Sequence, residues 1–306
     1  MAAQSMKKKE GRRRLRVHEV LDVPLREVSG ICLRRARSGQ MSLMAVGDCG
    51  AKVAWIDLPR GDDESSGEWR TADVSRLPGS RLPADDPQLE AICADGAGRV
   101  LLLQETPARA EVVDVEAARV IASISLEIHG DTELARSWCD PECSHGEGAV
   151  LLRGGHLLIA KEKHPAALIE FGPKGARSQG LARGDALADG AAWPIKQGEH
   201  RFVALAVWQP DKALRKVCSD FSDLEIGPDG RLYVLSDKSA AIARLEDLSP
   251  GGGDATLAAS WTLDDVGGKP EGLSFSAEGH AVIALDKDKR KNNLLVLAPA
   301  IATDVK

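Results

Sequence analysis

A short motif recurs along this chain at constant spacing, and this repeat constrains the fold more than any other feature of the sequence. Each copy begins with a Ser or Glu, here called the lead residue, and ends after a turn and an apolar segment in an acid, here called the terminal acid. The spacing between the two is 15 in four copies (90 to 105, 147 to 162, 222 to 237, 271 to 286) and 19 in a looser first copy (29 to 48). Self-similarity of this kind is typical of repeat architectures. The lead residues are Ser29, Glu90, Glu147, Ser222 and Glu271, and the terminal acids are Asp48, Glu105, Glu162, Asp237 and Asp286.

The segments between the turns have the length of strands. Apolar runs such as 100–103, 157–160 and 281–285 are brief and are bounded by Gly, Pro, Asp or Asn, and the chain carries 30 Gly and 15 Pro. Few stretches have helical periodicity, and 131–138 is the best short candidate. Many short strands between frequent turns predict an all-β sandwich, barrel or propeller. The repeat favours a single β-propeller, because each unit then buries its faces against its neighbours around an axis.

The number of copies predicts five blades. The interval 172–218 is long enough to contain a degenerate sixth, so six blades remain an alternative, as does a sandwich with accidental internal similarity. The missing strand of each blade is expected in intervals such as 120–126, 202–207 and 258–263. Residues 15–20 precede the first copy and are expected to pair with the last blade, which closes the ring.

Composition sets the boundaries and the compartment. We expect a basic, disordered tail over 1–14, a propeller over 15–300 and a short tail over 301–306. No apolar run approaches the roughly 20 residues of a membrane-spanning helix. No export signal is recognisable, so the six cysteines are expected to be reduced thiols in the cytoplasm. The net charge of -6 gives no pull toward nucleic acid, and the basic start lacks interleaved aromatic residues.

In a propeller the lead residue and the terminal acid of every copy meet at one rim of the central channel. Eight of these ten positions are carboxylates, and two such charges about 4 Å apart repel by roughly 4 kcal/mol at an effective dielectric constant of about 20. A hard cation, bound protons or nearby lysines would relieve this repulsion, and oxygen ligands favour Ca²⁺ and then Mg²⁺. Alternatively, the lead acids accept backbone N–H bonds from the next blade and lock the ring. The expected metal ligands are Glu90, Glu147, Asp237 and Glu271, and the other rim residues are Ser29, Asp48, Glu105, Lys161, Ser222 and Asp286.

The runs 89–105, 145–165, 221–237 and 270–286 resemble the SdiA-regulated β-propeller family, above all His145-Gly146-Glu147-Gly148 followed by Lys161-Glu162-Lys163-His164-Pro165. The related esterase-like phytase propellers show similar Ser-Gly, Glu-Gly and Ser-Asp signatures. The resemblance covers about residues 27–297. It implies a propeller fold and a Ca²⁺ site at the axial rim, and no particular reaction.

A cluster of soft ligands leads into the third copy. Cys139, Cys143 and His145 have the spacing C-x3-C-x-H, but a zinc site needs a fourth ligand or an open position. No second cluster is present, although the fold could bring Cys49 or Cys218 close. The alternative is two loop thiols and a rim histidine. His145 is the first candidate for a general acid or base at the rim, and His164 is the second.

Two classes of function are consistent with these patterns. The first is a metal-dependent hydrolase of an ester, lactone or phosphoester, with His145, Glu147 and Glu162 as catalytic residues. The second is a non-catalytic binding or scaffold propeller that holds a structural cation. We expect a monomer that binds either a small molecule at the axis or a protein partner. No G-x-S-x-G elbow, phosphate-binding loop, dinucleotide fingerprint or H-E-x-x-H motif is present.

Overall fold

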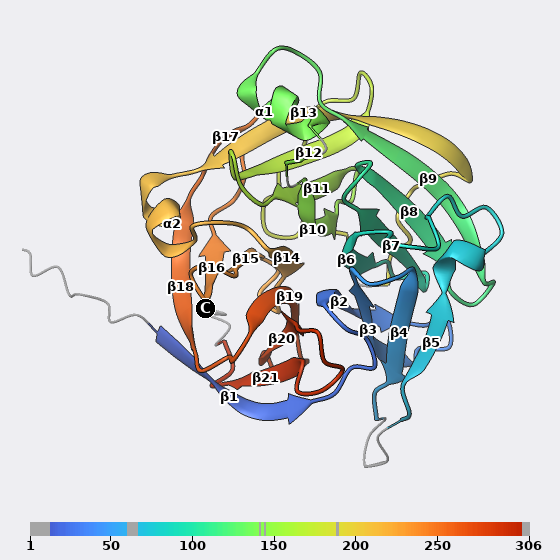
Figure 1. Cartoon of the computed structure of the whole chain (residues 1–306). Coiled ribbons are helices and arrows are strands. Elements are labelled where there is room, and N and C mark those ends of the chain that lie inside the picture. The colour runs from blue at the N-terminus through green and yellow to red at the C-terminus, as the bar shows by residue number, and fades with distance from the viewer. Residues whose placement is uncertain (1–12, 60–66, 141, 144, 188–189, 302–306) are drawn as a thin grey trace, which may run out of the picture.

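The computed structural model describes residues 13–59, 67–140, 142–143, 145–187 and 190–301. Its strands form four-stranded antiparallel meanders arranged around a common axis, with the first strand of each meander innermost (Figure 1). The fold is therefore a β-propeller, as the repeat predicts. Most of the two tails expected over 1–14 and 301–306 lies outside the described residues. The boundary of the first tail is shifted, because Arg13 and Arg14 already belong to a strand.

Each copy of the motif supplies the inner strands of one meander. The first meander contains β2 (Val28–Arg35), β3 (Met41–Gly47), β4 (Lys52–Asp57) and β5 (Arg70–Asp73), followed by the short 3-10 helix η1 (Val74–Arg76). The second contains β6 (Leu89–Ala94), β7 (Arg99–Gln104), β8 (Arg109–Asp114) and β9 (Arg119–Glu127). The third contains β10 (Gly146–Leu151), β11 (Leu157–Lys161), β12 (Ala167–Pro173) and β13 (Gly198–Pro210).

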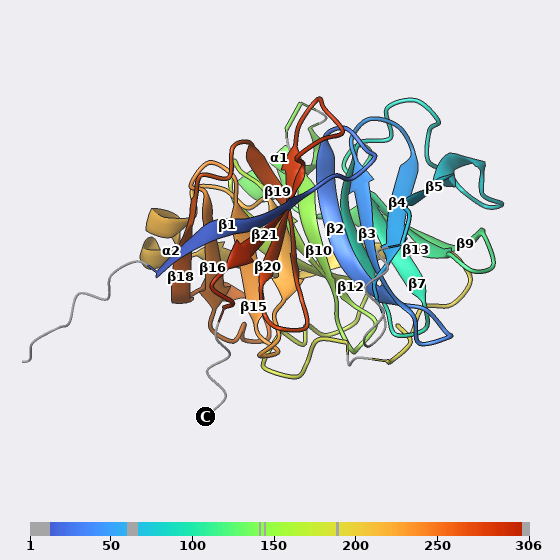
Figure 2. The same cartoon turned by 90° about the horizontal axis from the view of Figure 1, so that it is seen from below.

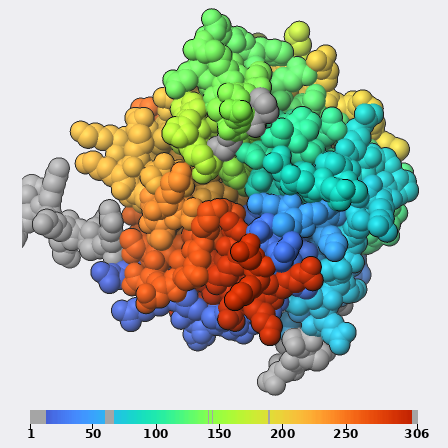
Figure 3. All heavy atoms as spheres, viewed as in Figure 1, coloured from blue at the N-terminus to red at the C-terminus, as the bar shows by residue number. Residues whose placement is uncertain are grey.

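The remaining meanders close the circle. One contains β14 (Asp223–Ile226), β15 (Leu232–Ser236), β16 (Ala241–Leu245) and β18 (Leu257–Asp264). The last contains β19 (Lys269–Phe275), β20 (Ala281–Asp286) and β21 (Leu294–Ala298), and its outer strand is β1 (Arg13–Leu21). The predicted pairing of residues 15–20 with the last copy is thus present, and Figure 3 shows the first and last strands meeting on the surface.

Hydrogen bonding merges the meanders into sheets of eight, nine and four strands. The merging occurs at the outer edge, where β9 pairs in parallel with β13 and β1 pairs in parallel with β18. These pairings cover outer strand edges that would otherwise be open to pairing with other chains. Figure 2 shows β1 crossing the outside of the ring.

Few elements lie outside the meanders. Besides η1, the described residues contain α1 (Glu133–Cys139), α2 (Lys212–Val217) and β17 (Gly253–Ala255). The helix predicted at 131–138 corresponds to α1, whose N-cap is Thr132. In the interval 172–218 the described residues form the end of β12, β13 and α2, and no further meander. None of the helices in the described part of the chain is long and apolar enough to cross a membrane.

The hydrophobic core is divided into clusters, and each cluster lies between two successive meanders. One cluster combines Leu103 of β7 with Ile159 of β11, and the next combines Leu158 of β11 with Val234 of β15. The closing cluster joins Ala45 of β3 to residues of β20 and β21. A meander therefore buries its two faces only when both neighbours are present, which ties closure of the ring to folding.

Candidate functional site

A β-bulge places the lead residue in four of the five inner strands. Where β2 pairs with β3, the register skips Ser29, and the equivalent skips fall at Glu90, Glu147 and Glu271. A bulge leaves one residue outside the ladder and turns its side chain away from the alternating pattern. The same irregularity at the same position of each copy therefore turns the lead side chains in one common way.

In four of the five copies the residue after the lead residue is Gly or Ala, because the inner strands come very close there. A Cβ atom on Gly30 would lie 2.9 Å from the Cα atom of Ala91, and one on Gly148 would lie 2.5 Å from the backbone nitrogen of Leu224. Real Cβ atoms do not approach backbone atoms so closely. The lead residues therefore stand around a narrow axis.

Two of the inner strands are locked to their neighbours by side chains. The Ser29 hydroxyl donates to the carbonyl of Leu89 on the next inner strand. Asp223 accepts from the backbone nitrogens of Leu224 (2.7 Å) and Leu273 (2.6 Å), and so bridges β14 and β19. The repeat did not point to Asp223, although it occupies the position that holds Gly or Ala in the other copies.

The lead acids of the second and third copies do not form such hydrogen bonds between neighbouring inner strands. Neither Glu90 nor Glu147 accepts a hydrogen bond from the described part of the chain. The Ser222 hydroxyl instead accepts from the backbone nitrogen of Asp237 at 2.9 Å, which fixes the fourth copy internally. The alternative of acids that lock the ring thus does not account for Glu90 and Glu147.

Lysines neutralise one part of the rim. The Lys269 ammonium lies 2.8 Å from Glu271 Oε1 and 2.9 Å from Asp286 Oδ2. Glu162 forms an ion pair with Lys163. No pattern in the sequence pointed to Lys269, because it precedes the motif and reaches the terminal acid only through the fold.

Around Asp237 the rim includes a second acid that lies outside the motif. Burial and the nearby charge of Asp220 raise the pKa of Asp237. Lys238 Nζ lies 4.0 Å from Asp220 Oδ2 and 3.7 Å from Glu162 Oε1. Asp237 therefore stands in a mixed acidic and basic environment.

Asp48, Glu90 and Glu147 are among the rim acids that have no ion pair with a lysine or arginine of the described chain, and burial affects these three strongly. Burial raises the pKa of Asp48 to about 7, with Glu271 and Asp286 adding repulsion. Burial also raises the pKa of Glu90 and of Glu147 well above the ordinary value, and the charges of neighbouring acids, Glu105 among them, act in the same direction. The Oδ1 atom of Asp48 is buried without a hydrogen-bond partner among the described residues. A bound proton or a bound cation would therefore stabilise these carboxylates.

Glu271 shares this behaviour in weaker form. Its pKa is raised to about 7 by burial, although the Lys269 ammonium pulls it downward. Because the Lys269 charge does not fully offset the effect of burial, the charge of Glu271 is only partly neutralised.

Beside the acids lie two buried basic side chains. His145 is 3 % exposed, its backbone nitrogen donates to Glu105 Oε1 at 2.9 Å, and its Nδ1 lies 4.0 Å from that atom. Its ring stands edge-on to Trp138 at 5.5 Å, and burial lowers its pKa. Lys161 is fully buried, its Nζ donates to the carbonyl of Lys163 at 2.7 Å, and burial lowers its pKa too. Perturbed groups of this kind gather at functional sites more often than elsewhere.

The two cysteines of the soft-ligand cluster do not join His145 in a buried site, and the second acid–base candidate, His164, is not buried either. Cys139 is exposed, Cys143 is half-buried and His164 is exposed. No group of three or more His, Cys, Asp or Glu side chains within the described ranges stands in an arrangement that would hold a metal ion.

Comparison with known proteins gives a likeness of overall fold. No family model matches the chain, and no curated protein matches it. A protein of unknown function from Bacteroides caccae is 16 % identical over 80 % of this chain and 65 % of that one, with a TM-score of 0.37. A catalytically inactive virginiamycin B lyase from Staphylococcus aureus with quinupristin is 9 % identical over 94 % of this chain and 99 % of that one, with a TM-score of 0.46. A luciferin-regenerating enzyme is 11 % identical over 92 % of this chain and 95 % of that one, with a TM-score of 0.44. At these scores the likeness carries no argument about activity.

Proposed function

We propose that this chain is a five-bladed propeller whose acidic rim binds one divalent cation, Ca²⁺ in preference to Mg²⁺. Counting each meander as one blade is supported by the division of the core, since every hydrophobic cluster lies between two consecutive meanders. Kinship with the SdiA-regulated propellers is part of the proposal and is supported by the motif residues.

The observation that carries the proposal is the group formed by Asp48, Glu90 and Glu147. These carboxylates repel one another, are withdrawn from water and form no ion pair with the described chain. All their donor atoms are oxygens, the ligand type that Ca²⁺ and Mg²⁺ prefer, and Ca²⁺ tolerates irregular geometry better than Mg²⁺.

Cation binding would require the carboxylates to rotate. No three of the described side chains already stand as a ligand set, but the bulges fix the backbone and leave the side-chain torsions of Glu90 and Glu147 available. Of the residues expected from the sequence, Glu271 is already engaged by Lys269, and Asp237 lies in the mixed environment near Lys238. We therefore place Asp48, Glu90 and Glu147 nearest the ion, with Glu271 and Asp237 outside them.

The first test is thermal unfolding with added cation. Ca²⁺ should raise the unfolding midpoint of the wild type, because a ligand at 100 times its Kd adds about 2.7 kcal/mol to the stability of the native state. Glu147→Gln should lose most of this shift, whereas Glu278→Gln, at an exposed turn, should keep it. A wild-type midpoint that does not move with millimolar Ca²⁺ or Mg²⁺ would remove the cation from the proposal.

A second candidate function, hydrolysis at the same rim, is favoured by His145 and Lys161. A bound cation would polarise an ester, lactone or phosphoester oxygen and lower the pKa of a bound water. His145 is kept neutral by burial and so can accept a proton, while the backbone contact with Glu105 holds it in place. Glu162 is paired with Lys163, so in this proposal it would orient groups at the rim.

The hydrolase proposal and the scaffold proposal differ in whether the protein turns over a substrate. On a panel of small esters and lactones, the hydrolase proposal expects His145→Gln to lower kcat by roughly 10²-fold while the Ca²⁺ shift in melting is retained. The matched control is His18→Gln, which should keep full activity because His18 is exposed on the outer strand β1. A wild type without turnover on this panel, but with an intact Ca²⁺ shift, would favour the scaffold propeller with a structural cation.

A further inference from the structure

The central channel contains a second group of chemically active side chains below the acidic rim. Three positions after each lead residue, the inner strands carry a residue that lines a cavity of about 230 Å³. The repeat therefore builds a second level of side chains around the axis. In chain order these residues are Cys32, Cys93, Val150, Glu225 and Ser274.

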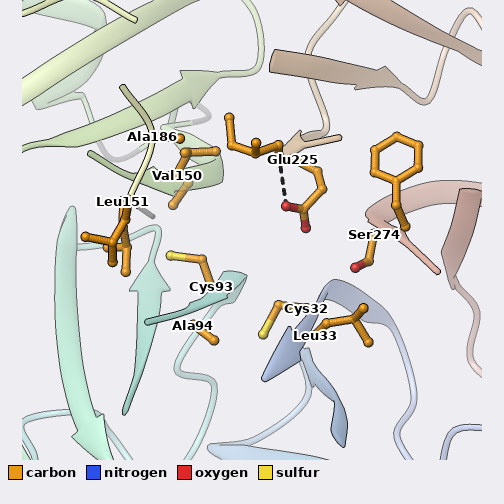
Figure 4. A pocket seen from close by; sticks show the side chains of 13 residues that line it. Cys32, Leu33, Cys93, Ala94, Val150, Leu151, Ala186, Glu225 and Ser274 are labelled. Carbon is orange, nitrogen blue, oxygen red and sulfur yellow. Dashed lines mark hydrogen bonds between the residues drawn. The ribbon is translucent and has the colours of Figure 1, made fainter. Parts of the chain in front are cut away.

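Two thiols lie side by side on one wall of this cavity. Cys32 on β2 and Cys93 on β6 occupy equivalent positions on adjacent inner strands. Figure 4 shows the two side chains as neighbours whose sulfur atoms point in different directions, so a shared ion requires the side chains to rotate. The two strands approach closely just above, where Gly30 meets Ala91. Both cysteines are free, and burial, followed by the charge of Cys32, raises the pKa of Cys93 well above its ordinary value.

The opposite wall is polar but uncharged near neutral pH. Glu225 accepts from the backbone nitrogen of Ile226 at 2.8 Å and a hydrogen bond links it to Ser274. Burial raises the pKa of Glu225 to about 8, so its carboxyl is mostly protonated at pH 7. Figure 4 shows Glu225 across the cavity from the thiols, whereas Ser274 lies beside Cys32.

The cavity can be reached from the face opposite the rim. It adjoins a wider depression of about 530 Å³, formed where the inner strands end. The depression has Arg35 and Arg153 in its lining. Both spaces are lined by Leu33, Ala94, Ala186, Leu187 and Ile226.

We propose that Cys32 and Cys93 together bind one soft, thiolate-preferring cation of the copper(I) type. Soft sulfur ligands select such ions over the hard cations that suit the rim. Copper(I) is satisfied by two sulfur ligands, whereas structural zinc requires four, and no described group of three ligating side chains is assembled at this level. The site is thus separate from the acidic rim and independent of its function.

Binding exchanges protons for the metal without any change of oxidation state. Each thiol loses one proton to solvent, two S–H bonds are replaced by two S–Cu bonds, and the complex carries one negative charge. Burial, with the charges of Glu225 and Asp223, raises the pKa of Cys32 well above its ordinary value, and the Arg34 guanidinium acts in the opposite direction. The ion must therefore displace a firmly held proton, and the raised pKa of Glu225, about 8, reduces the nearby negative charge at pH 7.

The experiment measures how many equivalents of copper(I) the protein withdraws from the chelator bicinchoninate under anaerobic, reducing conditions. The full chain is used with Cys49, Cys139 and Cys143 replaced by Ser, because these thiols are exposed or half-buried. We expect this background to withdraw one equivalent of copper(I) and to gain a higher unfolding midpoint from it. Cys32→Ser and Cys93→Ser should each abolish both effects. Cys218→Ser is the matched control, since Cys218 is also buried but lies in a core cluster away from the channel.

If a serine variant fails to fold, Cys32→Val and Cys93→Val replace it, because Val150 already occupies the same position in β10. Retention of copper by these valine variants would overturn the proposal, and so would a background that withdraws no copper. A background that instead holds one equivalent of zinc and loses it in Glu225→Gln would also overturn it, in favour of a site with more ligands.

Discussion

Glu147→Gln is expected to raise the unfolding midpoint of the metal-free protein at pH 8 and to leave it almost unchanged near pH 4. Burial and the neighbouring acids raise the pKa of Glu147 in the folded state. A carboxyl whose pKa is higher in the folded than in the unfolded state lowers the free energy of unfolding at any pH at which the unfolded chain is ionised. Each tenfold difference between the two ionisation constants is worth about 1.4 kcal/mol. The neutral amide removes this penalty. We expect a gain on the order of 1–3 kcal/mol at pH 8, which corresponds to several degrees.

The sign of the pH dependence follows from the same raised pKa values. Below about pH 4 both states of the wild type hold the proton, and the raised pKa has no effect. As the pH rises toward 7, the unfolded chain loses its protons while Asp48 and Glu271, with pKa values raised to about 7, retain theirs. The stability of the metal-free wild type should therefore fall between about pH 4 and pH 7, as measured by melting in the presence of a chelator.

Glu170→Gln is the matched control with the opposite sign. Glu170 is also buried, but it accepts from His156, Ser178 and two backbone nitrogens, and these bonds lower its pKa. A lowered pKa adds stability above the unfolded value and loses it in acid. Glu170→Gln should thus lower the midpoint at pH 8. If Glu147→Gln behaved like Glu170→Gln in the absence of metal, the Glu147 carboxylate would have a favourable partner and the unneutralised part of the rim would not exist.

The sequence predicted the arrangement of strands because the repeat reports it directly. The fixed spacing of 15 between lead residue and terminal acid places both ends of a hairpin, and the hairpin β10–β11 begins and ends where the third copy does. Closure by residues 15–20 also followed, since a ring needs a partner for its last meander. The parallel pairings at the outer edge were not predictable, because the intervals that contain the outer strands differ in length and composition.

At the rim, the sequence identified which acids occur but not how they are neutralised. The bulges at Glu90 and Glu147 shift the register by one residue, which a pattern of alternating burial does not reveal. Lys269 lies outside the motif and pairs with two acids through tertiary structure alone. The axial cysteines, in contrast, could have been found from the repeat, since Cys32 and Cys93 follow their lead residues by the same three positions.

Gly148→Ala is expected to cause the largest loss of stability among single substitutions near the rim. The added Cβ atom would lie 2.5 Å from the backbone nitrogen of Leu224 and 2.8 Å from the backbone of Asp223, and neither can move without shifting β14. Overpacking against backbone costs about 1–3 kcal/mol and occasionally more. Because the shift also displaces Glu147, the Ca²⁺-dependent rise in melting should shrink together with the stability.

Gly268→Ala separates this effect from the general cost of replacing a glycine. Its added Cβ atom would meet the Lys287 side chain at 2.8 Å, and that flexible chain can move aside. Chemical denaturation should therefore give nearly the wild-type free energy for Gly268→Ala and a clearly lower one for Gly148→Ala. Equal stability of the two variants would mean that β10 and β14 are not held so closely. The inner strands would then not bring the lead acids together around a narrow axis, and the proposed site would be contradicted.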